Sequence, residues 1–205
     1  AIEYLRKNGQ AKAEKKAGKI AAEGLCRVVV SEDCKKAAVV EVNSQTDFAA
    51  KTDEFTAFAE AVANPALATT AADTEAFMAE PWALEPSKTV SEVLIEKIAK
   101  IGENLNIRRF DKMEEADGCV VSYVHGGGRI GVVVKFDTNA ADNDEFKVVA
   151  KDVAMQIAAA NPLFLDRASV PAEVSEKEKA IMVTQMKEDP KMANKPEAVL
   201  EKIVE

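Results

Sequence analysis

An abrupt change in the spacing of apolar residues marks the first half of the chain. Ala37 to Val42 is a run of small and β-branched residues of strand length, and the polar residues 43–47 end it. Thr52 or Asp53 is placed to cap a helix that follows. The apolar positions of that helix share one face: Phe55, Phe58, Ala59 and Val62. The pattern predicts a strand, an exposed polar turn and a helix, and it leaves Phe48 outside both periodic segments.

An aromatic residue in such a turn has two interpretations. Phe48 could fold back onto the following helix as a hydrophobic staple. Alternatively, it could stay exposed on a loop that a strand and a helix hold in place, where it would be available as an anchor for a partner's pocket. The pattern alone does not decide between the two.

The same order of elements occurs twice along the chain. Leu25 to Val30 and Ala37 to Val42 flank a short polar connection, so a β-hairpin precedes the first turn and helix. From Gly118 onward, two apolar strands again surround a turn, and residues 139–146 form a second polar turn and helix start. The predicted apolar face of this second helix consists of Phe146, Val149, Val153 and Ile157. We therefore predict an α+β fold of two pseudo-symmetric modules, each a small antiparallel sheet with helices on one face.

Short helices and breaks are predicted for the segments outside these hairpins. Ala1 to Ala22 favours two short helices or an exposed, locally basic arm. Prolines interrupt residues 63–87, where Trp82 is expected to pack a surface loop onto the body. Thr89 and Glu92 have the spacing of a capping box. The helix that they open is predicted to end at Gly102.

A protruding antiparallel helical hairpin is predicted at the end of the chain, from two charged helical segments at residues 172–187 and 197–204. The expected organisation then has four parts: an N-terminal helical arm or linker (1–23), a first core module (24–112), a second core module (113–170) and the helical hairpin (171–205).

The composition favours a soluble intracellular protein, with 47% hydrophobic and 30% charged residues and no apolar run of the length that a membrane span needs. A net charge of -8 argues against a general binder of nucleic acid or membrane surfaces, which would need a basic face. Cys26, Cys34 and Cys119 are odd in number and lack CxxC spacing, which fits a reducing compartment. A single histidine argues against structural zinc.

The glycine-rich turn of the second hairpin matches two motifs of enzymes. Gly126, Gly128 and Gly131 satisfy G-x-G-x-x-G, and His125 with the next three glycines matches an esterase oxyanion loop. The dinucleotide fingerprint needs a helix after the glycines, but residues 132–136 predict a strand. No serine lies in a nucleophile elbow, as an esterase would require. We interpret the glycines as a hairpin turn with positive φ.

Longer segments resemble one family. The stretch NSQTDFAAKTDEF, residues 43–55, resembles the signature segment of bacterial and organellar elongation factor Ts. Further segments are similar to the same family in the same order: KIGENLNIRRF (100–110), HGGGRIGV (125–132), NPLFL (161–165) and EKIVE (201–205). Ala49 and Ala50 depart from the family, which often carries Val after the Phe, and this trims side-chain volume beside Phe48.

The resemblance implies a guanine nucleotide exchange factor for elongation factor Tu that is not an enzyme and uses no cofactor or metal. The residues that it implies for binding at the Mg²⁺ site of the partner are Thr46, Asp47, Phe48 and Ala49. Those that it implies for secondary contacts are Ile101, Gly102, His125 and Gly126.

The resemblance also implies a location in the bacterial cytoplasm or an organellar matrix. No nucleic-acid or membrane partner is expected, and a homo-oligomer is expected only through the complex with elongation factor Tu. Since the family has an N-terminal helical domain and a tail after the hairpin, we expect the chain to be a core fragment. An alternative is a ribosome- or RNA-associated protein that uses the basic first stretch and has no exchange activity.

Overall fold

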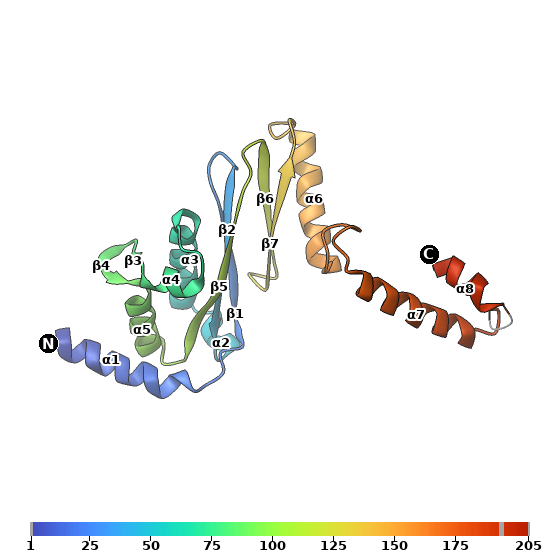
Figure 1. Cartoon of the computed structure of the whole chain (residues 1–205). Coiled ribbons are helices and arrows are strands. Elements are labelled where there is room, and N and C mark those ends of the chain that lie inside the picture. The colour runs from blue at the N-terminus through green and yellow to red at the C-terminus, as the bar shows by residue number, and fades with distance from the viewer. Residues whose placement is uncertain (1, 193–194, 205) are drawn as a thin grey trace. The chain divides into compact units, whose positions relative to one another are not determined.

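A computed structural model describes the backbone of residues 2–192 and 195–204, and the side chains of residues 9–192, 195, 196 and 198–204. The chain forms two compact units, Ala1–Ala160 and Asn161–Glu205 (Figure 1). The elements of the first unit are, in order, α1 (Ile2–Ala17), β1 (Glu23–Val30), β2 (Lys36–Ser44), α2 (Asp47–Ala50), α3 (Asp53–Ala68), α4 (Thr74–Ala79), β3 (Pro81–Trp82), β4 (Glu85–Thr89), α5 (Val90–Ile101), β5 (Leu105–Glu114), β6 (Gly118–His125), β7 (Ile130–Asp137) and α6 (Asp144–Ala160). The second unit contains α7 (Ala172–Glu188) and α8 (Glu197–Val204).

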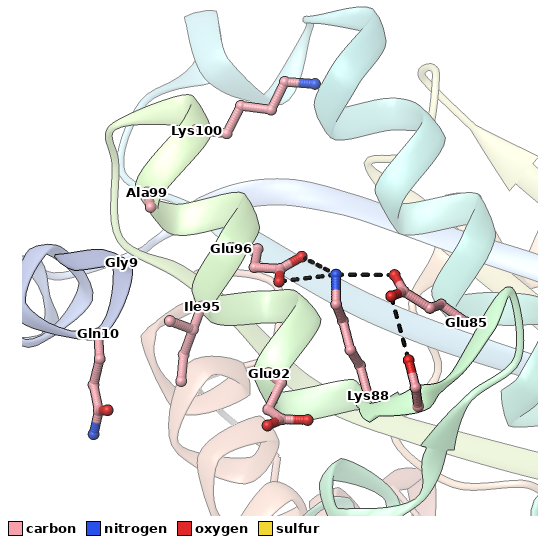
Figure 2. Close-up of a pocket in the computed structure, with 10 residues that line it drawn as sticks. Gly9, Gln10, Glu85, Lys88, Glu92, Ile95, Glu96, Ala99 and Lys100 are labelled. Carbon is pink, nitrogen blue, oxygen red and sulfur yellow. Dashed lines mark hydrogen bonds and ion pairs between the residues drawn. The ribbon is translucent and has the colours of Figure 1, made fainter. Parts of the chain in front are cut away.

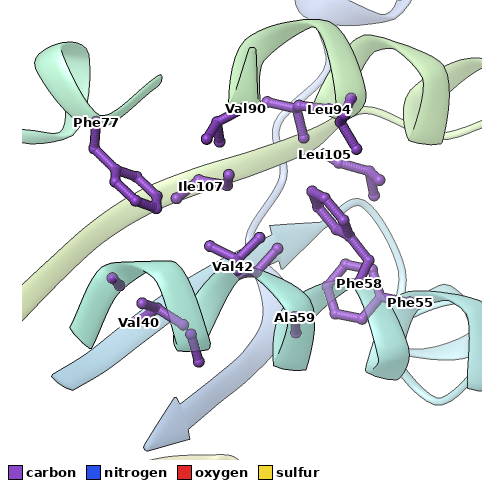
Figure 3. Packing of buried hydrophobic residues seen from close by; sticks show 14 of the residues in the cluster. Val40, Val42, Phe55, Phe58, Ala59, Phe77, Val90, Leu94, Leu105 and Ile107 are labelled. Carbon is purple, nitrogen blue, oxygen red and sulfur yellow. The ribbon is translucent and has the colours of Figure 1, made fainter. Parts of the chain in front are cut away.

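A three-stranded antiparallel sheet organises the first unit, with the strand order β1-β2-β5. Side chains alternate between the two faces of a strand, so Val40 and Val42 of β2 point to the same face. They pack into a buried cluster with Phe55 and Phe58 of α3 and with residues of α4, α5 and β5, as Figure 3 shows. The predicted strand, turn and helix are confirmed, and the α+β class with them.

The β6–β7 hairpin lies against the opposite face of this sheet. A Cβ added to Gly131 would lie only 3.1 Å from Cys26 Cβ and 3.3 Å from side-chain atoms of Val28 and Val39, so a side chain there would force these neighbours to shift. Val39 alternates along β2 with Val40 and Val42 of the core, so the residues that Gly131 approaches lie on the other face of the sheet. The sheet therefore has helices on one face and the second hairpin on the other.

The face of α6 that packs on the β6–β7 hairpin differs from the predicted one. Phe146 does contact the hairpin, with its ring 5.4 Å from that of Phe136 in an edge-to-face arrangement. However, the buried residues are Ala150 and Ala154, while Val149 and Val153 are 58% and 38% exposed. The prediction chose the larger apolar side chains, whereas small alanines let the helix lie close to a narrow two-stranded surface.

Other local predictions also need correction. The first segment contains the single helix α1, which contacts α5, rather than two short ones, so Gly9 does not interrupt the helix. Pro65 does not end α3, which continues to Ala68. By contrast, the prediction for Trp82 is confirmed, because it is 5% exposed, with its ring 6.1 Å from that of Phe58, and packs the short β3–β4 hairpin onto the body.

The second unit consists of the two predicted helices in contact with each other. Among its described side chains, Val183 and Leu200 are buried. Val174, Ile181 and Met182 of α7 and Val199 and Ile203 of α8 remain partly exposed. Across the described residues of both units, no helix combines the length and the apolar character needed to cross a bilayer.

Candidate functional site

The turn that precedes α3 is a short helix, α2, whose first side chains face solvent. Thr46 is its N-cap, and the Thr46 hydroxyl accepts a hydrogen bond from the Ala49 amide at 3.2 Å. Ala49 and Ala50 are buried, whereas Phe48 is 80% exposed. The staple interpretation is therefore wrong: Phe48 does not pack on the following helix. A large apolar side chain therefore faces solvent directly before two alanines that are buried in the core.

Glu103 fastens this turn to the end of α5. One carboxylate oxygen of Glu103 accepts from the Thr46 amide at 3.0 Å, and the other accepts from the Thr46 hydroxyl at 2.7 Å. Ser44, which is fully buried, donates from Oγ to the Thr46 carbonyl oxygen at 3.0 Å. Glu103 directly follows Gly102, the left-handed C-cap of α5 with φ 82°. Thr46 thus has both of its backbone polar groups and its side chain bonded.

Asp47 and Lys51, four residues apart, form an ion pair with 2.6 Å between Asp47 Oδ2 and Lys51 Nζ. The hydrogen bond from Lys51 lowers the pKa of Asp47, so this carboxylate carries its charge throughout the neutral range. Both side chains are largely exposed, and the pair contributes little to stability. Asp47 is therefore a negative charge that a partner can reach, next to the exposed ring of Phe48.

A second carboxylate ties α3 to α5 behind the turn. Glu54 of α3 pairs with Lys100 at 2.6 Å and with Lys97, both on α5. These hydrogen bonds, first that of Lys100 and then that of Lys97, lower the pKa of Glu54 to about 2. Thr52 caps α3 and also donates to the Ala49 carbonyl oxygen at 2.8 Å. The helix after the turn and the helix that ends just before Glu103 are thereby held together.

The glycine-rich turn between β6 and β7 carries His125. Its Nδ1 lies 2.9 Å from the Tyr123 hydroxyl oxygen, and its carbonyl oxygen accepts from the Arg129 amide at 3.0 Å. The φ angles of Gly126, Gly127 and Gly128 are 59°, 69° and 109°. Among the amino acids, only glycine readily adopts positive φ at three consecutive positions. The predicted hairpin turn is confirmed, with a strand rather than a helix after it.

All of the predicted contact residues lie at one end of the three-stranded sheet. Ser44 pairs with Glu23 on β1 and with Leu105 on β5, so the Thr46 turn and the end of α5 are neighbours. The carbonyl oxygen of Gly128 accepts from the amide of Cys26 at 2.6 Å. Cys26 is three residues along β1 from Glu23, which corresponds to about 10 Å. The two turns, one before α3 and the other between β6 and β7, thus lie toward the same end of the sheet although they are far apart in the sequence.

The sequence prediction included Thr46, Asp47, Phe48, Ala49, Ile101, Gly102, His125 and Gly126, but it missed Glu103, Lys51 and Ser44. A carboxylate just after a glycine C-cap was the available signal for Glu103. Its partner, Thr46, lies 57 residues away, so no local spacing could identify the pair.

A separate groove of about 850 Å³ lies between α1, α5 and β4 and includes none of these predicted contact residues. Figure 2 shows Lys88 in it, between Glu85 and Glu96, with 2.9 Å from its Nζ to a carboxylate oxygen of each. These bonds, first that of Glu85, raise the pKa of Lys88. Within the part of the chain that the structure describes, no three His, Cys, Asp or Glu side chains gather as a possible metal site.

A family model described as "Elongation factor TS" matches residues 45–205. The chain is 48% identical over 204 residues to elongation factor Ts of Clostridium perfringens (strain SM101 / Type A), and 45% identical to those of Clostridium kluyveri and Trichlorobacter lovleyi over 204 and 207 residues. In each case the match covers 100% of this chain and 65% of the relative. A family match over most of the chain, and relatives at this identity along all of it, show that the chain belongs to the elongation factor Ts family.

Proposed function

We propose that the chain acts as a guanine nucleotide exchange factor that binds elongation factor Tu and promotes the release of GDP. The observation that carries this proposal is the Thr46 turn, where a phenylalanine ring is 80% exposed beside buried alanines. Exposed aromatic side chains on rigid supports are typical of binding hot spots. The turn is such a support, because Glu103 and Ser44 bond to Thr46 from two directions. In this role the chain performs no covalent chemistry and holds no nucleotide.

The mechanism is differential affinity. A GTPase holds GDP through its phosphate-binding loop and Mg²⁺, and an exchange factor accelerates release only by binding more tightly to the states that have lost those contacts. In our proposal, Phe48 enters a pocket of the GTPase domain and shifts the elements beside the metal site. Asp47 then places its carboxylate near the Mg²⁺ environment, and loss of the ion unscreens the phosphates, so that GDP leaves faster.

The glycine-rich turn provides a second contact in this proposal. His125 and Gly126 lie toward the same end of the sheet as Phe48, because the turn that they open bonds to Cys26 near the start of β1, which supports simultaneous binding to a single partner. Ile101 and Gly102 extend the first contact, because the residue after them bonds to Thr46. Two anchors on one rigid unit bind without the entropy cost of ordering two separate segments.

A few side chains can supply the difference in binding free energy that the mechanism requires. Moving a two-state partner from 1:99 to 99:1 requires about 5.5 kcal/mol of differential affinity. Burying a phenylalanine contributes about 1.5–3 kcal/mol, and interface hot spots contribute about 2 kcal/mol or more each. Phe48 with one or two of the other contacts is therefore sufficient.

The test is the rate at which a fluorescent GDP leaves purified elongation factor Tu in the presence of the full chain. We expect acceleration by the unmodified chain, and a reduction of that acceleration by about 10- to 100-fold in Phe48→Ala, since about 1.4 kcal/mol corresponds to a factor of ten. Leu84→Ala is the matched control, because Leu84 is 77% exposed in the turn between β3 and β4 and lies outside the proposed contact. Equal rates with Phe48→Ala and the unmodified chain would refute the proposed role of the turn.

A further inference from the structure

Two of the three cysteines lie side by side, although they are far apart in the sequence. Cys34 is exposed in the connection between β1 and β2, and Cys119 is buried near the start of β6. The carbonyl oxygen of Cys34 accepts a hydrogen bond from the amide of Val120 at 2.7 Å. This bond joins the peptide groups that directly follow the two cysteine Cα atoms.

The backbone separation suits a disulfide. A hydrogen bond between these two peptide groups keeps the Cα atoms of Cys34 and Cys119 within roughly 7.5 Å of each other, because each Cα lies only about 2.4 Å from the bonded atom of its peptide group. Disulfides span Cα distances of about 4.4–6.8 Å. The Lys35 ammonium donates to the carbonyl oxygens of Ala116 and Gly118, and it fixes the chain that leads to Cys119 against the connection.

The electrostatics of the thiols agree with this placement. Burial is the main cause that raises the pKa of the Cys119 thiol, and negative charge on Cys34 is the next. The two sulfur atoms are thus close enough for one to affect ionisation of the other. Cys34 has a positive φ of 54°, a conformation that only the surrounding contacts maintain for a residue with a side chain.

We infer that Cys34 and Cys119 are a redox pair that forms a reversible intramolecular disulfide when the protein meets a peroxide. The exposed Cys34 thiolate attacks one peroxide oxygen, the O–O bond breaks, and Cys34 becomes a sulfenic acid while the other oxygen leaves as water after protonation. The Cys119 thiolate then attacks the Cys34 sulfur, the S–O bond breaks, and a second water leaves. In total, two thiols lose two hydrogens to one hydrogen peroxide, which is reduced to two waters.

The third cysteine is an internal control. Cys26 pairs with Glu41 on β2, eight residues along the chain from Cys34, and lies beside the glycine-rich turn. Burial is the main cause that raises its pKa. Cys26 is therefore far from the pair and is expected to keep its thiol. The disulfide would tie the β1–β2 hairpin to β6 at the end of the sheet opposite to the Thr46 turn.

The experiment counts free thiols in the unfolded full chain after treatment with hydrogen peroxide at low protein concentration and removal of the peroxide. The sequence has three cysteines, and we expect one thiol to remain and three to return after reduction with dithiothreitol. Cys26→Ser should fall from two thiols to none. Cys34→Ser and Cys119→Ala should form no intramolecular disulfide. Peptide mapping should join the fragments that contain residues 34 and 119.

Three outcomes would overturn the inference. The first is a thiol count that stays at three while an exposed control thiol reacts under the same conditions. The second is irreversible oxidation of Cys34 alone. The third is a disulfide that links two copies of the chain through Cys34, visible as a dimer on a non-reducing gel. Circular dichroism of Cys119→Ala checks that loss of the disulfide does not reflect loss of the fold.

Discussion

Replacing Glu103 with alanine removes the side chain that holds the Thr46 turn against the end of α5. The carboxylate accepts two hydrogen bonds from one residue, at 3.0 Å from the amide and 2.7 Å from the hydroxyl. A hydrogen bond to a charged group contributes about 1.5–3 kcal/mol. Glu103 is only half-buried, and water replaces part of the loss, so we expect the pair together to contribute about 1.5–3 kcal/mol to keeping the turn closed.

This free energy corresponds to local opening that is more frequent by about 10- to 150-fold. Hydrogen–deuterium exchange of the Thr46 amide measures that opening directly, and we expect its protection to fall by this factor in Glu103→Ala. The buried cluster around Phe55 does not include Glu103, so amides of α3 should keep their protection. Glu103→Gln keeps the volume and one carbonyl acceptor, and its loss of protection should be smaller.

The same variants test whether exchange depends on the rigidity of the Thr46 turn as well as on its contact residues. If a rigid Thr46 turn presents Phe48 to the partner, Glu103→Ala should weaken the acceleration of GDP release without removing any contact residue. Glu75→Ala, a change of an exposed glutamate in α4, is the control for the lost charge. Protection of the Thr46 amide that is unchanged in Glu103→Ala would refute the argument that Glu103 clamps the turn.

Two further predictions concern stability. The pKa of Glu54 is lowered to about 2, first by its hydrogen bond to Lys100, so its contribution is complete above the ordinary value of 4.5 and is lost as the pH falls toward 2. The free energy of unfolding of the unmodified chain in urea should therefore exceed that of Glu54→Gln by a margin that shrinks as the pH falls from 4.5 to about 2. A margin that does not change with pH would contradict this prediction. Gly24 has φ 151°, and a Cβ there would lie 2.1 Å from the Val42 carbonyl oxygen, so Gly24→Ala should cost about 3 kcal/mol or more. Gly18→Ala, with open space around the new methyl, is its control in the same denaturation experiment, and equal midpoints would count against the steric argument.

The sequence by itself determined the features that depend on neighbours a few residues apart. Thr52 caps α3, and Thr89 with Glu92 forms the predicted capping box. Gly102 adopts the left-handed conformation that ends α5. In each case the capping group and the group that it bonds to lie within four residues of each other, so the spacing alone carries the information.

The tertiary structure decided which faces are buried. Periodicity marked Val149 and Val153 as core positions of α6, but the helix packs on the narrow β6–β7 hairpin with Ala150 and Ala154. Likewise, the pattern predicted that Trp82 packs on the body but could not identify its partner, because Phe58 lies on α3, two elements earlier in the chain. Burial of a side chain depends on the surface opposite to it, which a local pattern does not contain.

In the candidate site, too, some features follow from the local sequence and others from tertiary contacts. The sequence identified Phe48 as an aromatic in a polar turn, and it left open whether the ring packs on its own helix or faces a partner. In the structure the ring does not pack on its own helix: Glu103 bonds to Thr46 across 57 residues, and Phe48 is exposed to solvent. The position of both the Thr46 turn and the glycine-rich turn toward one end of the sheet also depends on strand register and on one backbone hydrogen bond from Cys26. Long-range contacts of this kind arise only when the folded chain brings distant segments together.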